Sequence, residues 1–253
     1  MRQQNGTVVL IHSSASSGRQ WRSLSERLSD RYNVIAPDLS GYGPSDGDPG
    51  EYTFDDDCRL VRETIETVQG PVHLIGHSYG GLLSAKVALE RPDILHSLTL
   101  IEPVCFHLLN EAGESEAYAE IKGVSDSQKI AADSGDLLGS AEGFVTYWMG
   151  ANAWTNMPDE RRRMVASIMP KVAMEWSGAF ERTTCLAEYA LLPTKTLLIR
   201  ADDTTLAARR VIDLLLEQIR KREFVEIAYG GHMSPVTNSE PVNVAIDQFL
   251  GAL

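Results

Sequence analysis

The sequence predicts an α/β fold in which a doubly wound, mostly parallel sheet carries an inserted helical cap. Short apolar runs without polar alternation recur along the chain, as expected of strands covered on both faces. Helix-like segments separate these runs, which favours a parallel sheet. The rhythm stops between residues 104 and 191, where no strand candidate occurs. We therefore expect a core domain of residues 1–103 and 192–253, with a helical cap of residues 104–191.

The first third of the chain supplies two strands and a helix. Thr7 to Ile11 is an apolar run that ends in a loop of small residues, 12–18. Asn33 to Ala36 predicts the second strand, and the glycine and proline content of residues 37–45 predicts the loop after it. Asp55 to Val68 has helical spacing of apolar residues. Loops at the carboxyl ends of such strands are where open α/β sheets place their ligands.

The next stretch, Val72 to Gly81, carries the strongest chemical signal. An apolar strand runs into Gly76-His77-Ser78-Tyr79-Gly80, and a helix-like segment follows. The pattern Gly-x-Ser-x-Gly between strand and helix predicts a nucleophile elbow, a strained turn that presents one hydroxyl above the sheet edge. Ser78 is the predicted nucleophile. Tyr79 opens the helix, so its backbone N–H is free to bind a negatively charged oxygen near Ser78.

The remaining elements follow in order. Ser97 to Ile101 is a strand that ends at Glu102-Pro103, and two cap helices are predicted around Phe144 to Met149 and from Pro158 onward. The methionines and aromatics of the cap are interpreted either as the lining of an apolar acyl pocket or as ordinary core residues. The chain closes with strand Lys195 to Arg200, helix Leu206 to Ile219, strand Phe224 to Ala228, the loop Tyr229 to Met233 and helix Pro241 to Leu250.

Composition excludes several classes of partner. The 253 residues have a formal net charge of -12, which disfavours nucleic acid and anionic membrane surfaces. The three cysteines, Cys58, Cys105 and Cys185, are odd in number and lack a CxxC pair, so neither a disulfide framework nor a zinc site is indicated. No secretory h-region or apolar run of membrane-spanning length is present, and we expect a cytoplasmic protein. The oligomeric state is left open.

Four motifs in this order resemble the α/β-hydrolase fold superfamily over nearly the whole chain outside the cap. They are Val8-Val9-Leu10-Ile11-His12, Ala36-Pro37-Asp38-Leu39-Ser40-Gly41-Tyr42-Gly43-Pro44-Ser45, Gly76-His77-Ser78-Tyr79-Gly80-Gly81 and Gly231-His232-Met233. The resemblance implies a serine, acid and histidine triad in that chain order, with Ser78 as nucleophile and His232 as general base. The imidazole takes the serine proton as the bond to carbon forms. This chemistry requires neither a metal nor an organic cofactor, and none is expected.

The acid of this triad has two candidates. In most members of the superfamily it follows the strand that here is Lys195 to Arg200, but that register places Thr204 where the carboxylate should be. Asp203 serves if the loop is one residue shorter. A minority of members place the acid after the preceding strand, where this chain has Glu102. We favour Glu102, because a carboxylate at the end of a parallel strand is costly to bury without a partner.

The resemblance also implies two backbone donors for an oxyanion, from Ser14 and Tyr79. Family members usually carry His-Gly-x after the first strand, and here Ser13 replaces the glycine and Ser14 occupies x. Such donors stabilise the charge that develops on the carbonyl oxygen.

The leading hypothesis is a serine hydrolase of the carboxylesterase-like kind. It would cleave a small-molecule ester, thioester, lactone or small amide through an acyl-enzyme intermediate. The same fold and nucleophile also support hydrolysis of carbon-carbon bonds, and a ligand-binding or receptor protein on the same scaffold is the alternative from another class. The sequence does not identify the substrate, because specificity depends on the cap and the pocket shape.

Overall fold

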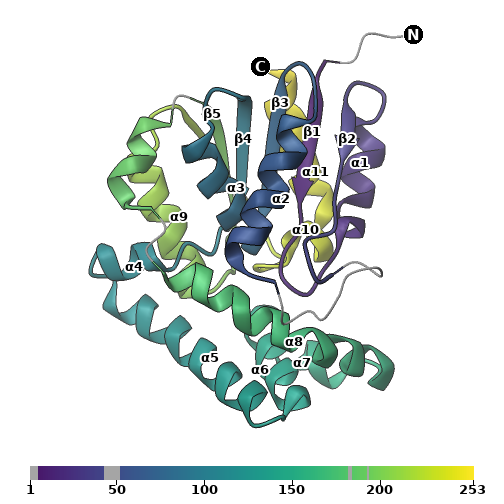
Figure 1. Ribbon diagram of the computed structural model, residues 1–253, viewed down its shortest axis with the longest axis vertical. Helices are drawn as coiled ribbons and strands as arrows, with labels where there is room; N and C mark the ends of the chain where they lie inside the picture. Colours follow the sequence, from purple (N-terminus) through teal and green to yellow (C-terminus); the bar gives the residue numbers. More distant parts are fainter. Residues whose placement is uncertain (1–4, 43–51, 182–183, 193) are drawn as a thin grey trace.

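Six parallel strands form a single sheet in the computed structural model, which describes residues 5–42, 52–181, 184–192 and 194–253. Their order across the sheet is β2-β1-β3-β4-β5-β6, and Figure 1 shows helices on both sides. Residues 43–45 of the second family motif, and the first residues of the chain, lie outside the described part. The strands are β1 (Thr7–Ile11), β2 (Asn33–Ile35), β3 (Val72–His77), β4 (Leu95–Ile101), β5 (Lys195–Ala201) and β6 (Arg222–Ile227).

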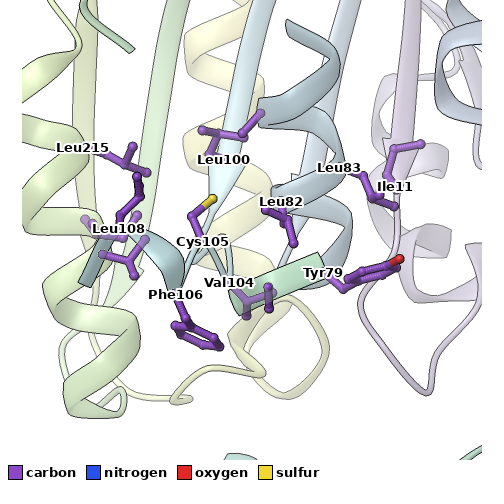
Figure 2. Close-up of a cluster of buried hydrophobic side chains, with 14 of the residues drawn as sticks. Ile11, Tyr79, Leu82, Leu83, Leu100, Val104, Cys105, Phe106, Leu108 and Leu215 are labelled. Carbon is purple, nitrogen blue, oxygen red and sulfur yellow. The ribbon is translucent and has the colours of Figure 1, made fainter. Parts of the chain in front are cut away.

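The strands are apolar on both faces because helices cover both. Val8 and Leu10 of β1 belong to one buried cluster, whereas Val9 and Ile11 belong to another. The first cluster includes α1 (Arg22–Leu28) and α11 (Ser239–Gly251), and the second includes α2 (Phe54–Glu66), α3 (Tyr79–Glu90) and α9 (Leu206–Gln218). Figure 2 shows part of the second cluster, where Leu83 of α3 lies beside Ile11 of β1. The predicted doubly wound sheet is confirmed.

Between β4 and β5, every secondary-structure element in the described residues is a helix. These are α4 (His107–Glu111), α5 (Ser115–Asp133), α6 (Leu137–Met149), α7 (Ala151–Thr155), α8 (Asp159–Phe180) and the short 3-10 helix η3 (Leu186–Leu191). Figure 1 shows α5 to α8 grouped beyond the carboxyl ends of the strands. The division of the chain into a core and a cap at residues 104 and 191 stays a prediction.

The order of the strands places a ligand-binding edge beside β1 and β3. The chain runs from β1 outward to β2 and then returns to the other side of β1 to form β3. Open α/β sheets bind their ligands at the carboxyl ends of strands around such a reversal. The loops after β1 and β3 therefore point to this edge, and the short helix α10 (Ser234–Thr237) follows the loop after β6. In the described part of the chain, no helix combines the length and apolarity needed to cross a membrane.

Candidate active site

Ser78 occupies a strained turn between β3 and α3. Its backbone has φ +56° and ψ -117°, a conformation that a non-glycine residue rarely adopts. The neighbouring glycines are required by close packing, as the sequence predicts. A Cβ atom at Gly76 would lie 2.2 Å from the carbonyl oxygen of Gly80, and one at Gly80 would lie 2.4 Å from that of His12. The turn therefore presents the Ser78 hydroxyl at the sheet edge.

His232 meets Ser78 across this edge although 154 positions separate them in the chain. The imidazole Nε2 lies 2.8 Å from the Ser78 hydroxyl oxygen. The ring comes from the loop after β6, in which Tyr229 and the two following glycines all have positive φ. Tyr229 is a strained residue at φ +62°. Both His232 and Ser78 are buried.

Glu102 completes a chain of three side chains. It follows β4 directly, with a φ of +42°, and its Oε2 lies 2.7 Å from Nδ1 of His232. Oε1 accepts the backbone N–H of Ala201 at 2.8 Å, and Oε2 also accepts the Thr204 hydroxyl at 2.6 Å. The carboxylate is fully buried, and every oxygen has a donor. A carboxylate in this position fixes the imidazole tautomer, so that Nδ1 carries the proton and Nε2 is free to accept one.

Asp203, the other candidate acid, lies in the same region but does not bind the imidazole of His232. Its Oδ1 accepts the backbone N–H of Gly231 at 2.8 Å. The preceding residue, Asp202, accepts the backbone N–H of Tyr229 at 2.9 Å in the same way. These two carboxylates hold the loop that carries the imidazole. Of the two candidates, the structure brings only Glu102 to the ring.

Ser14 and Tyr79 line the same cavity as Ser78 and His232. Tyr79 is the first residue of α3, where backbone N–H groups have no partner within the helix. Ser14 precedes Ala15, which has φ +51° and whose N–H binds the Tyr42 hydroxyl at 3.1 Å. This strained, tethered loop places Ser14 in the wall of the cavity that Ser78 also lines. The donor roles of both amides stay predictions.

A glutamine links the loop after β1 to the loop of His232. The Oε1 atom of Gln20 accepts the N–H of Ser13 at 3.2 Å and its hydroxyl at 2.9 Å. The Gln20 amide nitrogen lies 3.1 Å from Nδ1 of His77, and Nε2 of that histidine lies 2.8 Å from the carbonyl oxygen of His232. The serine that replaces the usual glycine is therefore part of this network.

Two buried histidines near the site are held neutral. Burial lowers the pKa of His12 to about 4 and that of His77 well below its ordinary value. Nε2 of His12 accepts the backbone N–H of Leu39 at 2.9 Å, which leaves the ring proton on Nδ1 for the carbonyl oxygen of Ser13. Both rings therefore act as hydrogen-bonding supports for loops, whereas His232 faces the nucleophile.

The cavity beside Ser78 is small and mostly apolar. It measures about 30 Å³, which leaves room for only a few water molecules. Trp148 of α6 stacks on the imidazole of His232, with ring centroids 3.9 Å apart and an angle of 30° between the planes. The walls of the cavity are formed by apolar side chains, among them Val104, Phe144, Trp148, Val172, Trp176 and Ala179. Helices α6 and α8 therefore supply much of the wall of the cavity beside Ser78.

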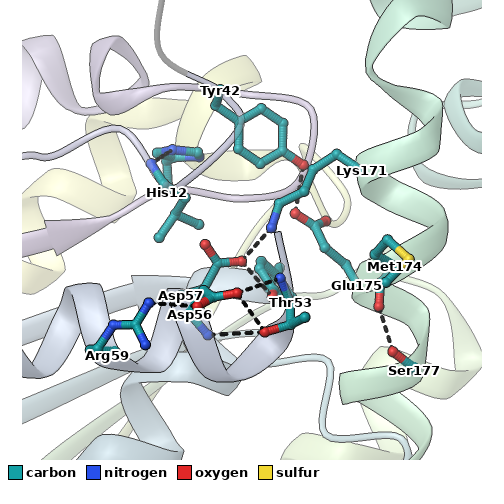
Figure 3. Close-up of polar contacts among 12 residues, drawn as sticks. His12, Tyr42, Thr53, Asp56, Asp57, Arg59, Lys171, Met174, Glu175 and Ser177 are labelled. Atoms are coloured by element: carbon teal, nitrogen blue, oxygen red, sulfur yellow. Dashed lines mark hydrogen bonds and ion pairs between the residues drawn. The ribbon is translucent and has the colours of Figure 1, made fainter. Parts of the chain in front are cut away.

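Glu175 of this cavity belongs to a group of buried charged and polar side chains, part of which Figure 3 shows. Lys171 and Asp57 form a buried ion pair with an N–O distance of 2.5 Å, and the Tyr79 hydroxyl donates to the same Asp57 oxygen at 2.8 Å. Glu175 lines the cavity itself, and its Oε1 accepts the Tyr42 hydroxyl at 2.6 Å. The site thus holds two buried glutamates, of which only Glu102 binds the histidine.

Glu175, the hydrogen bond from Thr204 to Glu102 and the buried position of Lys171 were not predicted from the sequence. Lys171 and Glu175 are four residues apart on one helix, a spacing typical of a solvent-exposed pair. Among the cap methionines, Met164 and Met174 are 57% and 38% exposed, so they do not line the cavity at Ser78. The sequence signal for the buried cluster was that Lys171 and Glu175 interrupt the apolar positions of α8. No cluster of three or more potential metal ligands occurs in the described residues.

Sequence comparison identifies one family and several named relatives. Residues 8–246 match the model of a family described as the alpha/beta hydrolase family. RutD of Pseudomonas syringae pv. syringae, which carries a provisional carbamate hydrolase name, is 27% identical over 250 residues, covering 96% of this chain and 93% of that protein. Lipase LipV of Mycobacterium tuberculosis is 28% identical over 260 residues, covering 96% and 93%. The pimeloyl-[acyl-carrier protein] methyl ester esterase of Aliivibrio fischeri is 35% identical over 104 residues, covering 41% and 39%.

Solved structures share the fold at lower identity. The alpha/beta hydrolase MGS-M2 from a Medee basin deep-sea metagenome library superposes with a TM-score of 0.80 at 16% identity, covering 99% of this chain and 91% of that one. MenH from S. aureus gives a TM-score of 0.75 at 18% identity, covering 99% and 95%. These similarities confirm the fold, including the helices that follow β4.

Proposed function

Because this chain belongs to the alpha/beta hydrolase family, we propose that it is a serine hydrolase that forms an acyl-enzyme intermediate. The substrate would be a small ester, thioester, lactone or amide. The observation that carries the proposal is the unbroken hydrogen-bonded chain from Ser78 through His232 to Glu102. A serine hydroxyl is a weak nucleophile at neutral pH, and an adjacent imidazole that is oriented by a carboxylate supplies the missing base.

The reaction would proceed in two steps. Nε2 of His232 takes the hydroxyl proton while the Ser78 oxygen attacks the carbonyl carbon, and Glu102 stabilises the imidazolium that forms. The backbone N–H groups of Ser14 and Tyr79 would bind the oxyanion. The imidazolium then protonates the leaving group, and the ester with Ser78 is formed. In the second step water attacks this ester while His232 takes a proton from it, and the imidazolium then returns that proton to the Ser78 oxygen as its bond to the acyl carbon breaks and the acid product leaves.

A fluorophosphonate probe and an aryl ester test this proposal. We expect the probe to label Ser78 in the folded wild-type protein and to leave denatured protein unlabelled. Ser78→Ala should lower kcat for 4-nitrophenyl butyrate by about 10⁵-fold or more while preserving the fold, because it removes the group that attacks the carbonyl carbon. Ser84→Ala is the matched control, since Ser84 is a buried serine of α3 with no hydrogen-bond partner among the described residues.

Two results would count against the proposal. One is a folded wild-type protein that the probe does not label and that hydrolyses no ester, which would favour a ligand-binding protein on this scaffold. The other is an equal loss of activity in Ser78→Ala and Ser84→Ala, which would indicate a structural effect of altering this helix.

A further inference from the structure

Glu175 of α8 is a second carboxylate at the catalytic cavity, and it lacks one hydrogen-bond partner. Its side chain belongs to a residue that is 4% exposed and lines the cavity beside Ser78. Oε1 accepts the Tyr42 hydroxyl at 2.6 Å, but Oε2 has no hydrogen-bond partner among the described residues. The Ser14 side chain also interacts with this carboxyl and lowers its pKa, although it makes no hydrogen bond to Oε2 in the described structure. A buried carboxylate oxygen without a donor is costly to maintain.

No neighbouring cation compensates the charge of Glu175 in full. Lys171, one helical turn earlier, is completely buried and directs its ammonium group to Asp57, with which it forms an ion pair. That pair is neutral as a unit, so an ionised Glu175 leaves one net negative charge in the cluster. Burial raises the pKa of Glu175 to about 7, although Lys171, Ser14 and Tyr42 all act to lower it. The cluster is therefore complementary to an added positive charge.

The remaining cavity wall also suits a cation. Besides Glu175, the lining includes the aromatic side chains of Tyr79, Phe144, Trp148 and Trp176. An ammonium group is attracted to the faces of aromatic rings, and tryptophan is the most favourable partner. An aromatic-lined cavity with a single free carboxylate oxygen therefore has the composition of an ammonium-binding site.

We propose that Glu175 forms a subsite for a protonated amine on the acyl part of the substrate, within a few bonds of the scissile carbonyl. This inference rests on the proposed serine hydrolase function. The small cavity limits the distance, because Glu175 and Ser78 line one space of about 30 Å³. Ser14 lines the same cavity, and its side chain acts on the Glu175 carboxyl, while its backbone N–H is the predicted oxyanion donor. The same carboxylate repels acyl groups that end in an anion.

Two isosteric esters test the subsite. The 4-nitrophenyl esters of β-alanine and of butyric acid differ by an ammonium group in place of a methyl group. At about pH 8, after subtraction of the rate with Ser78→Ala, we expect wild-type kcat/KM to favour the β-alanyl ester by about tenfold or more. Glu175→Gln keeps the shape of the side chain and removes its charge, and it should lower this ratio by about tenfold or more.

Tyr42→Phe is the matched control for Glu175→Gln. It removes the hydrogen bonds of the Tyr42 hydroxyl with Oε1 and with the Ala15 N–H but leaves the carboxylate, so any loss of kcat/KM should be equal for the two esters and the preference for the β-alanyl ester should persist. A merely structural role for Glu175 would instead lower kcat/KM for both esters equally. That result, or a wild-type protein with no preference for the amine, would overturn the subsite.

A competition experiment needs only the wild-type protein and covers the case in which Glu175→Gln does not fold. β-Alaninamide should slow the labelling of Ser78 by a fluorophosphonate at about tenfold lower concentration than butyramide does. Equal protection by the two amides would overturn the subsite while leaving the serine hydrolase intact. Absence of labelling in the folded protein would remove the proposed function, and the subsite with it.

Discussion

Glu102 and Glu175 are two buried glutamates beside one nucleophile, and they differ in how their oxygens are satisfied. Glu102 accepts three hydrogen bonds, from Ala201, Thr204 and His232. Glu175, which lines the cavity, accepts one from Tyr42, and its Oε2 has no hydrogen-bond partner among the described residues. A fully bonded carboxylate has a fixed position and charge, which suits a group that orients an imidazole. A partly bonded carboxylate is suited to accept a hydrogen bond from a ligand.

Glu102 and Glu175 also differ in backbone strain. Among the described residues, the non-glycine residues with positive φ are Ala15, Ser78, Glu102 and Tyr229. Ser78 and Glu102 belong to the proposed triad, Ala15 adjoins the predicted oxyanion donor Ser14, and Tyr229 lies in the loop of His232. Glu175 sits in a regular helix and needs no such strain. Strain at Glu102 therefore supports a catalytic position, whereas Glu175 depends on helix packing for its placement.

The largest expected effect separates Glu102 from every other carboxylate near the site. Glu102→Gln keeps the side-chain shape but removes the charge that stabilises the imidazolium and fixes its tautomer. We expect kcat for 4-nitrophenyl butyrate to fall by about 10³- to 10⁴-fold with a small change in KM. Steady-state kinetics across a range of substrate concentrations measure both parameters.

Asp203→Asn is the control for that variant. The Asp203 carboxylate binds a backbone N–H of the histidine loop and does not contact the ring, so we expect a loss of less than about tenfold. Equal, small losses in Glu102→Gln and Asp203→Asn would refute the assignment of Glu102 as the acid.

Much of the sheet and the position of Ser78 could be predicted because both depend on local sequence. In the register of β3 and β4, His77 pairs with Ile101, so the next residues, Ser78 and Glu102, emerge side by side. The Ser78 N–H binds the Ile101 carbonyl oxygen at 2.9 Å. Parallel pairing of consecutive strands thus brings the acid candidate to the nucleophile without any contribution from the helices between β4 and β5.

The partners of the two glutamates could not be predicted in the same way. Thr204 lies 102 positions from Glu102 in the chain, and the position that usually carries the acid in this superfamily here supplies a hydroxyl to it. Lys171, one helical turn before the buried Glu175, pairs with Asp57 of a different helix. Both contacts arise from tertiary packing between distant segments, and helical periodicity alone suggests that residues 171 and 175 face solvent.

Glu175 should make the free energy of unfolding depend on pH. Its pKa is about 7 in the folded protein against an ordinary value of 4.5, so the folded state binds this proton more tightly than the unfolded state does. The resulting stabilisation is complete below about pH 4.5 and is lost as the pH rises through about 7. Its size is about 3 kcal/mol. Lys171, Asp57 and Tyr42 are the titratable groups around residue 175, and they are the same in wild type and in Glu175→Gln.

Urea unfolding of wild type and Glu175→Gln between about pH 5 and pH 8 measures this contribution. The free energy of unfolding of wild type should fall relative to that of Glu175→Gln across the range. Asp203→Asn should run parallel to wild type, since that carboxylate is exposed. If the free energies of unfolding of wild type and Glu175→Gln changed in parallel with pH, Glu175 would have the same pKa in the folded and unfolded states, and the prediction would be wrong.

The smallest effect tests how Glu102 is held. Thr204→Val removes the hydroxyl that donates to Glu102 Oε2 at 2.6 Å and preserves the shape of the side chain. A hydrogen bond to a charged acceptor contributes about 1.5 kcal/mol or more, so kcat should fall about tenfold. Thr204→Ser should restore most of the rate, because it returns the donor without the methyl group. Equal rates for Thr204→Val and wild type would mean that His232 and Ala201 hold the Glu102 carboxylate without Thr204. The number of hydrogen bonds would then not explain why Glu102 and Glu175 differ in function.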